Sequence, residues 1–410
     1  MKNNLIAILL TLSLLSCSTN QKQEEASLAV TTMTSPTGVQ SATPHLFTDK
    51  NGMVYLSWTE KTDTLNWFKF SQLEGSVWSS PSVITTGNTW FVNWADYPMI
   101  ASDGGDNMIS HVLDKSGDGT YAYDVRMTSS HDRGQSWNQS FVLHDDGKQA
   151  EHGFVTLKPY DENIFVAWLD GRNTVPIAIG KEGMASAEHD AHDVAAGPMS
   201  LRAAILDYDG NKIEEWELDN KTCDCCQTDA AITSKGPVVV YRDRSDGEIR
   251  DMSIVRLVEG KWTTPKTIYA DNWKIAGCPV NGPRVASLEN TIAIAWFGMS
   301  NEQAEVKVIF SQDAGETFAQ PIRVDEGKPI GRVDVVMLDK DNAMVSWMED
   351  SDIKVVKVNR DGSKGSPVVI ATSSESRSSG FPQMTKSGNE LIFAWTDDAE
   401  KKVKVAKVSL

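Results

Sequence analysis

The sequence predicts an all-β fold, a β-propeller of four-stranded antiparallel blades, and three observations lead to it. A short apolar run that ends in an aromatic residue recurs along the chain, as in 292–296 (IAIAW), 343–347 (AMVSW) and 391–395 (LIFAW). These runs are spaced by about 50 residues, which is the size of one propeller blade. The 410 residues also include 29 Gly and 13 Trp, a composition that suits many tight turns and large packed rings.

Seven copies of the apolar run can be counted, and each predicts a strand covered on both faces. The runs are too short, and too rich in β-branched or aromatic residues, to be buried helices. Each has a turn and a short strand before it and an alternating strand after it, so one unit holds about four strands. We expect seven blades, with six as the alternative. The runs are 53–58, 108–112, 164–168, 238–241, 292–296, 343–347 and 391–395.

The two ends of the chain are predicted to meet in one blade. The last unit reaches Leu410 after only its third strand, and 27–33 (SLAVTTM) offers a fourth. Pairing these segments would close the ring and leave the last blade complete. We therefore expect one propeller domain over residues 28–410 rather than two or three domains.

The N-terminal segment is interpreted as a targeting signal and is left out of the fold. Lys2 precedes an apolar run over 5–15, which is too short to span a bilayer stably. The run ends at Cys17 in a pattern (LLSC) that resembles a bacterial lipobox. The resemblance implies a signal peptide over 1–16, lipid on Cys17, a flexible tether over 17–27 and an outer-membrane lipoprotein, facing either the periplasm or the outside. An ordinary secretory signal is the alternative.

The charge balance excludes one class of partner. The chain has 56 acidic and 39 basic residues, a formal net charge of −17. Nucleic acid binding needs a cationic surface, so we expect no nucleic acid partner. With 40% hydrophobic and 23% charged residues, the chain has the composition of a globular protein and not of a disordered one.

Two turns carry a more specific pattern. Residues 130–137 (SHDRGQSW) fit S-x-D-x-G-x-[ST]-W, and 311–318 (SQDAGETF) fit it with Phe in the last place. Here the sequence resembles the sialidase-like (BNR, or Asp-box) β-propellers. The Asp accepts turn N–H groups, the Gly takes a positive φ and the ring packs on the blade, so the motif indicates fold and not activity. The motif residues are Ser130, Asp132, Gly134, Trp137, Ser311, Asp313, Gly315 and Phe318.

Charged residues are predicted to gather on the opposite face. First strands begin and second strands end on one side of a propeller, so the residues at those positions converge around the axis. Arginines among carboxylates suit an anionic or sugar-acid ligand, because a guanidinium holds a planar carboxylate through two hydrogen bonds. The candidate binding residues are Glu151, His152, Asp170, Asp229, Arg244 and Asp334.

The candidate catalytic residues are an aspartate and four arginines on the same face. The sialidase resemblance implies three arginines for the substrate carboxylate, an acidic acid/base residue and a Tyr activated by Glu. The early Arg-Ile-Pro motif of that family is missing, since 42–46 reads ATPHL. Asp96 is the acid/base candidate by position alone, and no Tyr can be nominated. The set is Asp96, Arg172, Arg242, Arg284 and Arg332.

The cysteines form a separate feature. Four of them lead into two successive units of the repeat, three in 223–226 (CDCC) and one at Cys278. In an oxidising compartment we expect two disulfides among them, with three possible connectivities. The alternative is a thiolate metal site, because Cys223 and Cys226 have C-x-x-C spacing and thiolates suit Cu(I) or Zn. The four residues are Cys223, Cys225, Cys226 and Cys278.

Three functions remain open at the level of sequence. The first is a glycoside hydrolase of sialidase type, acting from the chain end on acidic glycans. The second is a non-catalytic propeller that binds a glycan or a protein, and the third is a metal-handling lipoprotein. Partners are then the membrane, through a lipid, and an acidic glycan or other small anion. No cofactor is expected apart from a metal at the cysteines.

Overall fold

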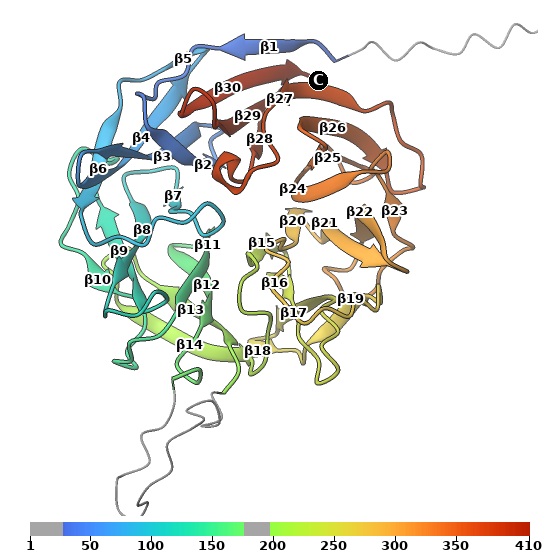
Figure 1. The fold of residues 1–410 in the computed structure, drawn as a ribbon, viewed down its shortest axis with the longest axis horizontal. Coiled ribbons are helices and arrows are strands. Elements are labelled where there is room, and N and C mark those ends of the chain that lie inside the picture. The colour runs from blue at the N-terminus through green and yellow to red at the C-terminus, as the bar shows by residue number, and fades with distance from the viewer. Residues whose placement is uncertain (1–27, 176–196) are drawn as a thin grey trace, which may run out of the picture.

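Seven antiparallel sheets stand around a central axis in the described residues, which are 28–175 and 197–410 of the computed structural model (Figure 1). Each sheet is one blade of a propeller, so the seven-blade prediction is confirmed and the six-blade alternative is excluded. The predicted signal peptide, the lipidation residue Cys17 and the tether all lie outside the described residues.

Blades 1 to 4 are the first four of the seven blades. In blades 1 and 4 an additional strand pairs with the third strand. Their strands are β2 (Ser41–Thr48), β3 (Val54–Thr62), β4 (Leu65–Glu74), β5 (Val77–Trp78) and β6 (Ser82–Gly87) in blade 1; β7 (Ile100–Ser102), β8 (Met108–Lys115), β9 (Tyr123–Ser130) and β10 (Phe141–Val142) in blade 2; β11 (His152–Tyr160), β12 (Asn163–Asp170), β13 (Ser200–Leu206) and β14 (Lys212–Asp219) in blade 3; and β15 (Asp229–Thr233), β16 (Gly236–Arg242), β17 (Met252–Val258), β18 (Lys261–Trp262) and β19 (Lys266–Tyr269) in blade 4.

Blades 5 to 7 complete the ring and include the 3-10 helix η1 (Arg377–Ser379). Among the described residues no helix has the length and apolar character needed to cross a membrane. The strands are β20 (Arg284–Leu288), β21 (Thr291–Ser300), β22 (Gln303–Ser311) and β23 (Ile322–Arg323) in blade 5; β24 (Pro329–Met337), β25 (Asn342–Glu349), β26 (Asp352–Asn359) and β27 (Val368–Thr372) in blade 6; and β28 (Gln383–Ser387), β29 (Glu390–Asp397), β30 (Lys402–Ser409) and β1 (Val30–Met33) in blade 7.

The second strand of each blade carries the apolar run and is buried on both faces. All seven residues of β16 are buried, as are all but the first in β12 and in β25. Each of these strands lies inside its own blade, and the two neighbouring blades pack on its two faces, so both faces contact apolar side chains. The interpretation of the runs as doubly covered strands is confirmed.

Acidic residues at the ends of the second strands satisfy buried indoles. Trp168 donates its Nε1–H to Asp170 at 2.9 Å, and Trp347 donates to Glu349 at 3.0 Å, in each case two residues further along. Trp58 has the same relation to Glu60 at 2.7 Å. A buried indole N–H needs an acceptor, so these carboxylates belong to the repeat itself.

The N-terminal strand closes the ring, as the sequence predicts. β1 pairs antiparallel with β30, with Val30 opposite Val408 and Met33 opposite Val405. In Figure 1 the blue strand lies beside the red ones at the end of the chain. The pairing protects the outer edge of β30, which would otherwise present unpaired backbone groups.

Side-chain acceptors near the axis tie neighbouring blades together at four junctions. Asp96 accepts the backbone N–H of Phe154 at 2.8 Å, joining blade 2 to blade 3. Asp229 accepts Val285 N–H at 3.0 Å, joining blade 4 to blade 5. The same bond joins blade 5 to blade 6 (Asn281 to Arg332 N–H, 2.7 Å) and blade 6 to blade 7 (Asp334 to Met384 N–H, 2.7 Å). We call these contacts the inter-blade hydrogen bonds.

Bulges in the first strands aim two of these N–H groups. Phe154 and Arg332 have positive φ values of 51° and 55°, and both lie at register shifts of their strand pairs. Positive φ costs free energy for residues other than Gly, and it persists where surrounding contacts fix it. Here the inter-blade hydrogen bond is one such contact.

The two Asp-box turns have matching hydrogen bonds. Asp132 accepts the backbone N–H of Ser136 at 2.8 Å and its hydroxyl at 2.6 Å, and Asp313 accepts the same groups of Thr317 at the same distances. Gly134 has a φ of 79°, a value that a residue with a Cβ rarely adopts. The hydrogen bonds from Ser136 hold the pKa of Asp132 at about 2, so this turn stays intact in mild acid.

Removing an inter-blade acceptor is expected to destabilise the ring. Asp229→Ala leaves the N–H of Val285 buried without its partner and removes the acceptor of Lys158. Such a loss costs about 1–3 kcal/mol, which chemical denaturation followed by tryptophan fluorescence would measure. The exposed Asp118→Ala is the matched control and should stay within about 0.5 kcal/mol of the parent protein. Equal stability of the two variants would contradict the role given to Asp229.

Candidate active site

The four predicted arginines are placed in different surroundings. Arg172 pairs with Asp170 at 2.8 Å and with Asp146 at 3.3 Å. Despite the burial of Asp170, the hydrogen bonds from Arg172 hold its pKa at about 2. Arg244 pairs with Glu248 at 2.9 Å. Both guanidinium groups are therefore neutralised by carboxylates of the chain.

Arg242 and Arg332 donate to backbone carbonyls. Arg242 is 2% exposed and donates to the carbonyls of Asn281, Arg250 and Phe297 at 2.7 Å each. Arg332 donates to the hydroxyl of Ser379 at 2.6 Å and to the carbonyls of Glu375, Ser376 and Gly380. These two side chains hold loops together through bonds to carbonyls and a hydroxyl of the chain.

Arg284 differs from the other three because it lines a cavity on the axis. The axial cavity has a volume of about 310 Å³ and is formed by the first strands of the blades. Arg284 is buried and forms no ion pair with any residue in 28–175 or 197–410, and burial lowers its pKa. The ionisable and amide side chains of the lining are His45, Lys158, Asp229, Arg284, Asp334 and Gln383.

The carboxylates of the axial cavity are already engaged. Asp229 meets Lys158 Nζ at 3.1 Å. Asp334 accepts the N–H groups of Val335 and Met384, and burial raises its pKa to about 6. The charge of Asp334 acts on Arg284 without a direct ion pair, so this buried guanidinium favours an anion beside it.

A second group of titratable residues lies around Asp96, on the same face of the propeller. We call Asp96, Tyr123, Glu151 and Asp224 the carboxyl cluster. The hydroxyl of Tyr123 donates to Glu151 Oε1 at 2.8 Å. Asp96 is 3% exposed, its Oδ2 has no partner, and burial with the charge of Glu151 raises its pKa well above the ordinary value.

Glu151 is the reactive candidate of this cluster. Burial and the charge of Asp224 raise its pKa to about 7, although the hydrogen bond from Tyr123 acts in the other direction. The residue keeps part of its surface exposed, whereas Tyr123 is fully buried against Phe91, with ring centroids 4.3 Å apart. Glu151 can thus exchange a proton near neutral pH, and Tyr123 positions it.

The sequence did not point to Tyr123. The residues predicted from the sequence lie at the starts of first strands and the ends of second strands. Tyr123 instead begins a third strand, β9. Tyr123 lies at the start of a strand and is bridged to Glu151. No motif surrounds it, so this position at a strand start was the one feature of the sequence that could have indicated it.

Residues 95–97 connect the carboxyl cluster to the axial cavity. The hydroxyl of Tyr97 contacts the guanidinium of Arg284 and accepts Gln383 Nε2 at 3.2 Å. The carbonyl of Ala95 accepts Gln227 Nε2 at 2.8 Å. Asp96 therefore faces blade 3, while its neighbour Tyr97 reaches two residues of the cavity lining.

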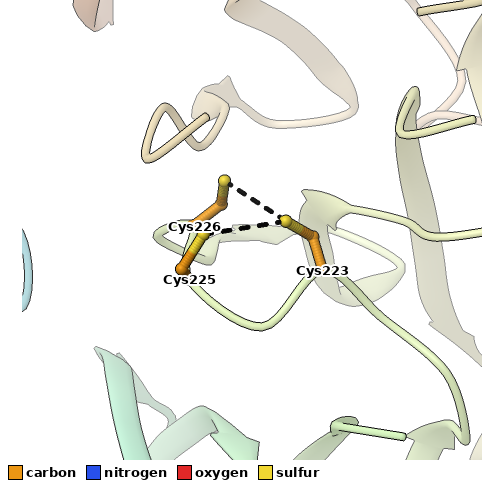
Figure 2. A group of neighbouring side chains, drawn as sticks. All are labelled: Cys223, Cys225 and Cys226. Atoms are coloured by element: carbon orange, nitrogen blue, oxygen red, sulfur yellow. Dashed lines mark hydrogen bonds between the residues drawn. The ribbon is translucent and has the colours of Figure 1, made fainter. Parts of the chain in front are cut away.

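Three thiols lie next to each other beside this segment (Figure 2). The Sγ atom of Cys223 is 4.0 Å from that of Cys225 and 3.6 Å from that of Cys226. We call these three residues the thiol cluster. They and the exposed Cys278 are free, since a disulfide needs a separation of about 2.05 Å. The two expected disulfides are not formed.

His152 and Asp170 form a buried ionic group of their own. His152 contacts Asp146 through Nε2 at 2.8 Å and stacks on His144 with ring centroids 3.5 Å apart. Burial, followed by the neighbouring His152, lowers the pKa of His144. Two sets of ligand atoms here are close enough to hold a metal ion, as they also are in the thiol cluster: Asp124 with His144 and His152, and Asp146 with His152 and Asp170.

Comparisons with known proteins support the fold alone. No family model and no curated protein matches the chain. Among solved structures, the polysaccharide lyase Uly1 is 9% identical with a TM-score of 0.54, covering 92% of each chain. The NanB sialidase of Streptococcus pneumoniae is 9% identical with a TM-score of 0.47, over 87% of this chain and 83% of that one. An ulvan lyase is 12% identical with a TM-score of 0.47, over 79% and 80%.

Removing the phenol that contacts Glu151 should raise the pKa of that carboxyl above about 7. The hydrogen bond from Tyr123 stabilises the ionised form, so Tyr123→Phe makes the ionised form less favourable. A carbon-13 NMR titration of glutamate carboxyls measures the change. The control is Tyr121→Phe, at a 59% exposed ring, which should leave the titration as it was. A lower pKa in Tyr123→Phe would refute the assignment.

Proposed function

We propose that this protein is a glycan-acting enzyme that cleaves an acidic saccharide, with Glu151 as the proton donor. The observation that carries the proposal is the partly exposed carboxyl of Glu151 with a pKa of about 7. A general acid works best when its pKa is close to the working pH. Cleavage of a glycosidic bond needs such a group to protonate the leaving oxygen.

Asp224 supplies the second carboxyl. Burial raises its pKa, whereas Arg244 lowers it. The guanidinium of Arg244 lies 3.3 Å from the carboxylate. The charge of Arg244 thus favours the ionised form of Asp224, beside the protonated form of Glu151 that burial favours. One carboxyl that donates a proton and one that accepts it are the usual arrangement for an acid and a base.

The acidic nature of the substrate rests on Arg284. This buried guanidinium forms no direct ion pair in the described part of the chain, although the charge of Asp334 acts on it, and it suits a carboxylate or sulfate of a sugar. The net charge of −17 disfavours a long polyanion. A short acidic saccharide, or the end of a chain, fits both features.

The shared fold supports the class of substrate in general terms. Uly1, a polysaccharide lyase, has the same propeller architecture at a TM-score of 0.54. Elimination next to a uronate carboxylate is therefore tested beside hydrolysis of a sialoside. Our proposal also keeps the cell envelope as the location, on the basis of the lipobox pattern that ends at Cys17.

The first experiment is a turnover assay on a panel of sialosides, sulfated glycans and uronate polysaccharides. Released sugar indicates hydrolysis, and an ultraviolet-absorbing unsaturated uronate indicates elimination. Turnover should fall as the pH rises through about 7, because a proton donor acts in its protonated form. Glu151→Gln should lower the rate about 10²- to 10⁴-fold. The exposed Glu74→Gln is the control and should keep the full rate. If the protein binds members of the panel saturably but forms no product from any of them, the proposed enzymatic activity is wrong and the protein is a glycan-binding protein.

The second experiment concerns Arg284. Arg284→Gln should weaken binding of an acidic saccharide about tenfold or more, since a hydrogen bond to a charged group contributes about 1.5–3 kcal/mol. Binding of the matching neutral saccharide should change little, which calorimetry can show. Arg126→Gln, on the outer part of blade 2, is the control. An equal loss for acidic and neutral ligands would mean that Arg284 only holds the fold.

A further inference from the structure

We propose that the thiol cluster of Cys223, Cys225 and Cys226 binds one soft metal ion, Cu(I) or Zn(II), independently of the proposed glycan chemistry. Thiolates are the ligands that these ions prefer. The three sulfurs all lie within 4.8 Å of one another. Metal–sulfur bonds of about 2.3 Å place sulfurs about 3.8 Å apart in a tetrahedral site and about 4.0 Å apart in a trigonal one. The two separations from Cys223 Sγ, 3.6 Å to Cys226 Sγ and 4.0 Å to Cys225 Sγ, are close to these values.

The segment that carries the thiols is held on both sides. The N–H of Cys223 donates to the carbonyl of Arg242 at 3.1 Å, next to the bridge between Thr222 and Asp243. After the thiols, the buried Gln227 donates to Ala95 and accepts the N–H of Gly282 at 2.9 Å. The ligands are thus fixed before a metal arrives, which lowers the entropic cost of binding.

A buried cation stands beside the sulfurs. Arg250 is 3% exposed, and its Nη1 donates to Cys223 Sγ at 3.2 Å. Its other ionic partner in the described residues is Glu248, at 2.9 Å. Three thiolates around Cu(I) carry a net charge of −2, and around Zn(II) a net charge of −1, so a neighbouring guanidinium offsets part of the charge. The sulfur of a disulfide is neutral and a weak acceptor, and it would offset Arg250 less well.

The arrangement of the sulfurs also distinguishes the two readings. A disulfide joins two sulfurs at about 2.05 Å. Here Cys223 is at similar distances from both of its neighbours (Figure 2). Cys225 is partly exposed, whereas Cys223 and Cys226 are buried, so one side of the cluster is open for entry of an ion. Cys278 lies next to Cys225 but outside the group of three sulfurs.

The test uses the full chain, reduced and purified without chelator, and titrated separately with Cu(I) and with Zn²⁺. We expect one equivalent to bind, with X-ray absorption showing metal–sulfur distances of about 2.3 Å. Cys223→Ser and Cys226→Ser should each reduce affinity at least tenfold. The matched control is Cys278→Ser, at an exposed thiol outside the cluster, which should keep one equivalent.

A second measurement decides the question if the serine variants do not fold. In the parent protein, bound metal should protect the three cluster thiols from alkylation and leave Cys278 reactive, as mapped by peptide mass spectrometry. Failure of the reduced protein to bind either ion would overturn the proposal. So would a disulfide within the cluster that forms quantitatively in air even with the metal present. Loss of glycan turnover with normal metal binding would count against the proposed function alone.

Discussion

The ring depends on how the free edges nearest the axis are satisfied. The first strand of each blade is an edge strand, and its N–H groups on the side of the axis have no strand partner. A side-chain acceptor from the preceding blade takes this place, as Asp96 does for Phe154, Asp229 for Val285 and Asp334 for Met384. Closure at the outside, between β1 and β30, then adds backbone pairing between the two chain ends.

This constraint changes the meaning of a polar propeller face. A carboxylate beside the axis is first of all an acceptor for the next blade, and an arginine such as Arg242 or Arg332 is first of all a donor to loop carbonyls. Chemistry is available where such engagement is incomplete. Among the described residues Arg284 forms no direct ion pair, and the side chain of Glu151 receives a hydrogen bond from the phenol of Tyr123 while facing the charge of Asp224. Most polar side chains of this face thus have structural roles, and Arg284 and Glu151 are the two candidates for chemistry.

The blades could be predicted from the sequence because their cause is local and repeated. The apolar runs, the turns at Asp132 and Asp313, and the closing strand 30–33 each follow from neighbouring residues. The site could be predicted only in part, because its partners come from connections outside the repeat. Nothing in the sequence around Tyr97 indicates that its hydroxyl meets Arg284, 187 positions away. The free state of the cysteines likewise depends on the distances between their sulfurs.

The thiol cluster and the carboxyl cluster share one short segment. Residues 223–227 contribute the three thiols, the carboxyl of Asp224 that acts on Glu151, and the amide of Gln227 that binds Ala95. Ala95 is followed directly by Asp96 and then by Tyr97, which reaches Arg284. The proposed metal site and the proposed catalytic carboxyls are therefore neighbours in the structure, because one short segment contributes side chains to both.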